Sequence, residues 1–191
     1  MNQVLIIAGK ETEKESLVSL LDCYSACQIL YASNSKQAKE LIADQTPSLI
    51  IINAPLPMET AQDLALFMTN RTDAAIILLL PESYRNIKEY SVEEFGILTL
   101  FKPFKRSEFE RTMKFANAFQ NRFAKMQEKN RKLQKQLTEV RTIHRAKCLL
   151  IQHLHMTEPQ AHRYIEKHAM DQRQSKMEVA NNIIQSYNVE S

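Results

Sequence analysis

The sequence predicts an α/β protein with a five-stranded, doubly wound parallel sheet, followed by a long coiled-coil helix and a C-terminal three-helix bundle. Short apolar runs alternate with amphipathic helical segments over about the first hundred residues, as in sheets built from β-α units. A heptad pattern without Gly or Pro then runs from Phe109 to Leu154. The chain has 191 residues. We divide it into a sheet domain (1–108), a coiled-coil segment (109–140) and a terminal helical domain (141–191).

The sheet domain is expected to alternate strands and helices. The expected strands are Val4–Ala8, Gln28–Ala32, Ser48–Asn53, Ala75–Leu80 and Leu98–Phe101. The expected helices are Thr12–Leu21, Ser35–Asp44, Thr60–Thr69 and Tyr84–Phe95. The apolar runs are of strand length and suit strands buried on both faces, so the sheet should be parallel, with any ligand site at the carboxyl ends of its strands.

The composition excludes several classes of protein. Only two glycines are present, which leaves no Gly-rich phosphate loop, and we expect no cofactor and no metal. Three cysteines without a signal-like N-terminus indicate a reducing, cytoplasmic setting. The longest apolar run, Ala74–Pro81, is too short to span a membrane. Residues 1–104 carry 8 Lys and Arg against 13 Asp and Glu, whereas residues 105–191 carry 17 against 9, so the second half is the candidate for binding an anion.

The heptad segment predicts a homodimer. Its a positions are Ala116, Phe123, Asn130, Leu137 and His144, and its d positions are Phe119, Met126, Leu133 and Val140. The predicted dimer seam comprises Phe119, Phe123, Met126, Asn130, Leu133, Leu137 and Val140. The single a-position Asn130 favours a parallel, in-register pair, because an asparagine facing its twin is hydrogen-bonded. The alternative is an ordinary amphipathic helix that packs on its own domain, which needs a wider apolar face.

Two features at the strand ends resemble a response-regulator receiver domain. Asn53 is followed four residues later by Pro57, and Lys102-Pro103 follows the fifth strand. The resemblance places the family's phosphoacceptor aspartate at Asn53, its acidic pair at Ala8 and Gly9, and its hydroxyl residue at Leu79 or Leu80. Of these functional positions, the only match is Lys102.

An asparagine amide is a poor nucleophile, and a magnesium ion beside a phosphoryl group needs two or three carboxylates. The sequence therefore predicts a pseudo-receiver that cannot be phosphorylated. Lys102 is expected either to be solvated or to hydrogen-bond the Asn53 amide. Glu11, Glu13 and Glu15 could supply oxygen ligands, but acids at a helix start are also favoured by the helix dipole.

The terminal segment contains two helix-start patterns. Thr157 with Gln160, and Ser175 with Glu178, have the spacing of capping boxes, and Pro159 is tolerated in a first helical turn. Residues 139–187 resemble an ANTAR domain, the RNA-binding module of AmiR- and NasR-type antiterminators. The resemblance rests on the stretches 146–150, 157–161, 168–173 and 179–180, and Cys148 departs from the glycine that is usual there.

This resemblance implies an RNA hairpin in an mRNA leader as the ligand. The candidate RNA-binding residues are Arg145, Lys147, Arg163, Lys167, Gln172, Arg173, Ser175 and Lys176. Basic side chains would contact phosphates, and polar ones would read loop bases. Each could instead be solvated surface. Tyr164 and His168 could stack on bases, but their helical spacing favours packing in the bundle.

The sequence thus predicts a dimeric transcription antitermination regulator whose pseudo-receiver responds to a sensor protein or a small-molecule effector. The alternatives are a DNA-binding transcription factor of response-regulator type and a signalling scaffold that binds no nucleic acid. No nucleophile, acid–base pair or cofactor loop favours an enzyme.

Overall fold

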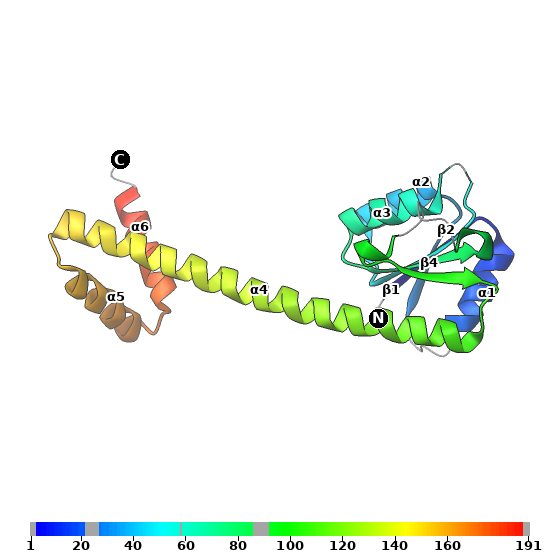
Figure 1. The fold of residues 1–191 in the computed structure, drawn as a ribbon. Coiled ribbons are helices and arrows are strands. Elements are labelled where there is room, and N and C mark those ends of the chain that lie inside the picture. The colour runs from blue at the N-terminus through cyan, green and yellow to red at the C-terminus, as the bar shows by residue number, and fades with distance from the viewer. Residues whose placement is uncertain (1–2, 22–26, 58, 86–91, 189–191) are drawn as a thin grey trace. The chain divides into compact units, whose positions relative to one another are not determined.

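The computed structural model describes residues 3–21, 27–57, 59–85 and 92–188. The chain forms two compact units, Met1–Ala124 and Lys125–Ser191, and the long helix α4 (Arg106–Leu154) contributes to both (Figure 1). Among the described residues, no helix is both long enough and apolar enough to cross a bilayer.

The first unit is built on a parallel five-stranded sheet with strand order β2-β1-β3-β4-β5, which confirms the predicted fold class. The strands are β1 (Gln3–Ala8), β2 (Gln28–Ala32), β3 (Leu49–Asn53), β4 (Ala75–Pro81) and β5 (Leu98–Lys102). The central strands β1, β3 and β4 are almost entirely buried, because helices cover both faces of the sheet.

The two faces have separate apolar cores. On one face, the helices α2 (Ser35–Asp44) and α3 (Ala61–Arg71) bury residues such as Ala38 and Leu64. The other face is covered by α1 (Glu11–Leu21) and the first turns of α4 (Figure 1). These helices bury Leu17, Phe109 and Met113. Apolar burial of this kind is the main stabilising contribution to the unit.

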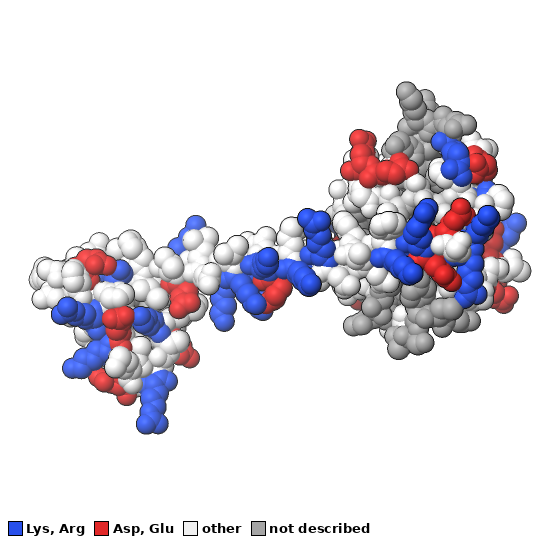
Figure 2. Space-filling model, turned by 60° about the horizontal axis from the view of Figure 1, so that its bottom comes forward, with Lys and Arg blue, Asp and Glu red and all other residues white. Residues whose placement is uncertain are grey.

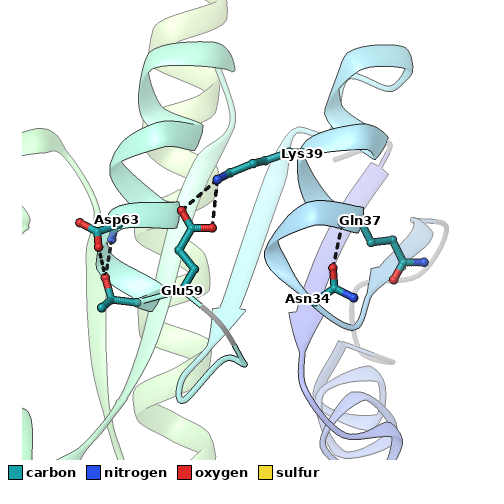
Figure 3. A network of polar contacts seen from close by, with 6 residues as sticks. Asn34, Gln37, Lys39, Glu59 and Asp63 are labelled. Carbon is teal, nitrogen blue, oxygen red and sulfur yellow. Dashed lines mark hydrogen bonds and ion pairs between the residues drawn. The ribbon is translucent and has the colours of Figure 1, made fainter.

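Side-chain caps fix where α2 and α3 begin (Figure 3). The Asn34 side chain accepts a hydrogen bond from the Gln37 backbone N–H at 3.0 Å, and Thr60 accepts one from the Asp63 N–H at 3.2 Å. Between the two helices, Lys39 Nζ donates to both carboxylate oxygens of Glu59, at 2.9 and 3.0 Å. The ion pair therefore links α2 to the loop that leads into α3.

The predicted helix Tyr84–Phe95 falls in the connection between β4 and β5, which the structure describes only in part. The described ends of this connection are single 3₁₀ turns, η1 (Glu82–Tyr84) and η3 (Glu93–Phe95), while residues 86–91 lie outside the described residues. Gly96 ends the second turn with φ 78°, a conformation that glycine adopts without steric cost. Of the apolar residues at this end of the connection, Phe95 is exposed and Val92 is buried in the core.

The helix α4 changes its surroundings along its length. Its first turns pack on the sheet, and this packing buries Ala116, which the heptad pattern placed at an a position. That assignment was wrong for Ala116, because the helix turns this side chain toward its own domain. Farther along, Met126, Leu133 and Val140 are 60–64% exposed.

The second unit ends in a small helical bundle. The helices α5 (Glu158–Gln172) and α6 (Lys176–Asn188) pack with the end of α4 around Ala146, Leu150, Ile165 and Ala180. Gln160 accepts a hydrogen bond from the Thr157 backbone N–H at 2.8 Å, and Glu178 accepts one from the Ser175 N–H at 2.7 Å. Both predicted helix starts are thus confirmed.

Candidate functional sites

The first candidate site is the carboxyl edge of the sheet. The strand register pairs Asn53 with Ala8 on one side and with Leu79 on the other. Lys102 ends β5 opposite Pro81, the last residue of β4. The four positions named from the receiver resemblance therefore come together at one edge of the sheet, where ligands bind in folds of this kind.

A chain of hydrogen bonds fills this edge. Lys102 Nζ donates to Asn53 Oδ1 at 2.8 Å and to the Ala54 carbonyl. Asn53 Nδ2 in turn donates to Glu13 Oε2 at 2.9 Å. Of the two alternatives expected for Lys102, the structure shows the hydrogen bond to the Asn53 amide. The sequence did not single out Glu13 among the three acids at the start of α1.

The surroundings of Lys102 shift its pKa. Burial lowers the pKa of the Lys102 ammonium, and the nearby Glu13 carboxylate raises it in part. The lysine is held between an amide oxygen and a backbone carbonyl, so its charge is used in structural hydrogen bonds. The network contains a single carboxylate, with an amide where phosphoryl transfer needs a nucleophile.

We expect that incubation with acetyl phosphate and magnesium leaves the protein unmodified, because neither Asn53 nor its neighbours Ala8 and Gly9 can accept a phosphoryl group. Intact-mass spectrometry with a phosphorylatable receiver as the positive control measures this. A phosphoryl mass increment assigned to residue 53, or to an acid at this edge, would contradict the prediction.

The second candidate site is the basic surface of the bundle, on which Lys and Arg side chains are spread (Figure 2). The structure divides the predicted RNA-binding residues into two groups. Lys147 forms an ion pair with Glu158, and its side chain is only 17% exposed. Lys176 forms an ion pair with Glu166 at 2.6 Å. The hydrogen bonds from these lysines lower the pKa values of Glu158 and Glu166.

The Ser175 hydroxyl is also engaged in local structure. It donates to Glu178 Oε2 at 2.8 Å and accepts from the Glu178 backbone N–H at 3.2 Å. Tyr164 and His168 stack on each other with ring centroids 4.0 Å apart, and both are half-buried. The packing interpretation of these two aromatic residues is therefore supported.

The remaining candidates are exposed and form no ion pair within the described part of the chain. They are Arg145, Arg163, Lys167, Gln172 and Arg173. On α5, the residues 163, 167 and 170 share a face opposite the buried Ala161, Ile165 and Ala169. The third member of that face, Met170, is 78% exposed, and the sequence reasoning did not select it. The helical period places Met170 on the same face as Arg163 and Lys167, so the sequence could have identified it.

Arg173 has an unusual backbone. It terminates α5 in the left-handed conformation, with φ 52°, and its neighbour Gln174 donates back to the Ala169 carbonyl at 3.0 Å. This conformation costs an L-residue about 1–2 kcal/mol relative to glycine, and it is glycine that most often occupies such helix ends. The left-handed backbone at this helix end therefore favours glycine, but the residue present is an arginine.

The predicted dimer seam lies on the surface of the single chain. Phe119, Met126, Asn130, Leu133, Leu137 and Val140 are exposed, and Phe123 is half-buried. Phe119 and Phe123 stack on each other with centroids 6.2 Å apart. Exposed apolar residues in a continuous stripe favour a partner helix.

Within the described residues, no group of three His, Cys, Asp or Glu side chains could hold a metal ion.

Comparisons with known proteins found matches for both parts of the chain. The model of the ANTAR domain matches residues 131–184. The transcriptional regulatory protein PdtaR of Mycobacterium tuberculosis is 26% identical over 155 residues, which cover 81% of this chain and 76% of that protein.

Solved structures resemble the first unit. The signal receiver domain of an HD domain-containing protein from Pseudomonas fluorescens has a TM-score of 0.56 and 22% identity, and the match covers 63% of this chain and 97% of that one. A receiver domain protein from Clostridium thermocellum has a TM-score of 0.56 and 18% identity, covering 66% and 99%. These likenesses show the receiver fold. The chain therefore combines a receiver-like fold with a C-terminal segment that matches the ANTAR domain.

Proposed function

We propose that this protein is a homodimeric transcription antitermination regulator that binds and stabilises a hairpin in the leader of a nascent mRNA. The observation that carries the proposal is that the ANTAR match, residues 131–184, coincides with a bundle on which Arg145, Arg163, Lys167 and Arg173 are exposed and form no ion pair within the described residues. Contacts between exposed cations and phosphates supply a large share of a protein's affinity for a nucleic acid. The similarity to a transcriptional regulatory protein supports the same role.

The structure favours some RNA contacts over others. Arg145, Arg163, Lys167 and Arg173 are the better candidates, because Lys147 and Lys176 already neutralise acidic side chains. Arg173 is the first choice, since an arginine kept in a left-handed conformation suggests a use for its side chain. Met170 offers an apolar surface on which an unpaired base could lie.

The dimer would form through the exposed stripe of α4. Because Ala116 packs on its own domain, the stripe continues toward the N-terminus through Phe115, which is 61% exposed. Phe115, Phe119 and Phe123 are then separated by two successive steps of four, and such a stutter locally unwinds a coiled coil. The regular heptads begin after Phe123.

The signal that controls this protein would not be phosphorylation. The Glu13–Asn53–Lys102 network occupies the site of that reaction, so a sensor protein or a small effector acting on the receiver-like domain would supply the signal. A DNA-binding role is the alternative outcome of the test below.

Replacing Arg173 by glycine tests the RNA interface without an expected loss of folding. Glycine relieves the left-handed backbone, so the thermal midpoint should stay the same or rise. Binding to a hairpin RNA should weaken by about fivefold to 150-fold if the arginine reads a base, corresponding to about 1–3 kcal/mol. If it contacts only a phosphate, the salt slope should fall by about one.

Arg111→Ala is the matched control, because Arg111 is exposed in the first unit. Affinities for hairpin RNA and for duplex DNA are compared at the same salt concentrations. Equal affinity of the unmodified protein for the two nucleic acids, or preference for DNA, would overturn the proposal. Unchanged affinity of Arg173→Gly would remove this residue from the interface.

A further inference from the structure

The middle of α4 carries a dense positive charge outside the bundle. Residues 125–141 hold six Lys and Arg against two Glu. Glu128 pairs with Arg131 at 2.9 Å and with Lys132 at 3.6 Å. Lys and Arg side chains stand in a row along this stretch of the helix (Figure 2).

Four lysines of this stretch form what we term the lysine band: Lys125, Lys129, Lys132 and Lys135. They are spaced by four, three and three residues, so they share one side of the helix over a length of about 15 Å. In the heptad they occupy positions c, g, c and f, beside and behind the seam. Formation of the dimer would leave them exposed, with one band on each helix.

Neither the helix nor the seam accounts for these charges. Like charges three or four residues apart destabilise a helix. In a parallel dimer, Lys129 at position g would face Gln134 at position e of the second copy, which offers no carboxylate. Lys125, Lys129 and Lys135 form no ion pair within the described part of the chain. Apart from Lys132, which pairs with Glu128, the band is thus a row of cations that form no ion pair within the described residues.

We propose that the lysine band binds the phosphate backbone of the same RNA whose loop is bound by the helical bundle. This inference rests on the proposed function. Four ammonium groups along one side of a rod match a row of phosphates and read no base, because lysine acts as a point charge. The band therefore supplies affinity that depends on salt and not on sequence.

The placement of the band fits this role. The band and the bundle belong to the same compact unit, joined by an uninterrupted helix. Along α4, Lys135 precedes Arg145 by ten residues, and Lys125 precedes it by twenty, which correspond to about 15 and 30 Å. An RNA held at the bundle reaches the band only if its stem or flanking strand extends that far.

The test uses the full-length protein with all four lysines of the band replaced by glutamine, which keeps the helix propensity. The matched control replaces Lys10, Lys36, Lys105 and Lys114, four exposed lysines of the first unit, and so removes the same charge. Circular dichroism and light scattering establish that both variants keep the helicity and mass of the parent. Two RNAs are titrated: a minimal hairpin, and the same hairpin with its stem and flanks lengthened by about 30 Å.

The parent protein should bind the longer RNA more tightly and with a steeper salt dependence than the minimal hairpin. The band variant should lose that difference, with the slope for the longer RNA reduced by about two to four, while its affinity for the minimal hairpin stays the same. The control variant should resemble the parent.

Equal affinity of the parent for the two RNAs would overturn the band proposal while leaving the hairpin function intact. The band proposal would also be overturned if the band and control variants lost affinity equally, because an equal loss reports only the net charge of the protein. If the parent binds neither RNA better than duplex DNA, the proposed function fails and the band proposal fails with it.

Discussion

Replacing both Leu133 and Leu137 by aspartate is expected to convert the protein from dimers to monomers. In the single chain these side chains are 64% and 51% exposed, so their loss removes little packing within the chain. In a paired seam the same change places four carboxylates in an apolar environment without hydrogen-bond partners, which is strongly unfavourable. Light scattering measures the mass, and circular dichroism checks that the helix remains.

The matched control introduces the same charge on the outer side of α4, through Asn121→Asp together with Thr138→Asp. Both residues are exposed and lie at positions f and b of the heptad. This variant should remain dimeric. An unchanged mass for the Leu133/Leu137 variant would mean that the stripe does not mediate pairing.

The dimer should bind an RNA with two hairpins much more tightly than an RNA with one. Once the first hairpin is bound, the second meets its module at a high effective concentration, and the gain can reach about 10²- to 10⁴-fold where the spacing fits. The Leu133/Leu137 variant should lose this gain while it keeps the affinity for a single hairpin. Titrations of the two RNAs with both proteins measure the ratio.

The length of the linker between the hairpins provides an internal control. The gain should pass through a maximum as the linker is lengthened, because a linker that is too short cannot span the two modules. A monomeric variant with full affinity for the two-hairpin RNA, or a dimer without any gain, would show that the two modules do not act together.

Much of the fold could be predicted from local patterns. The buried strands such as Leu49–Asn53 are continuous apolar runs, and the helix starts at Thr157 and Ser175 have capping sequences. These signals depend on residues a few positions apart, so they are visible in the chain itself.

At the carboxyl edge of the receiver-like sheet, some features could be predicted from the sequence and others were decided by the tertiary structure. The sequence identified Asn53 and Lys102 and determined that a phosphoacceptor was missing. Which acid would reach Asn53 was decided by the position of α1 on the sheet, which turns Glu13 toward the amide. Three glutamates at alternate positions cannot be distinguished without that placement.

The same holds for the basic half of the chain. The sequence determined the excess of Lys and Arg, the three helices and the apolar stripe of α4. The tertiary structure decided which charges remain available, since Lys147 meets Glu158 eleven residues away and Lys176 meets Glu166 ten residues away. It also decided that Ala116 is buried by its own domain. Such contacts depend on how helices approach one another, which the heptad period and the charge count of a single segment do not contain.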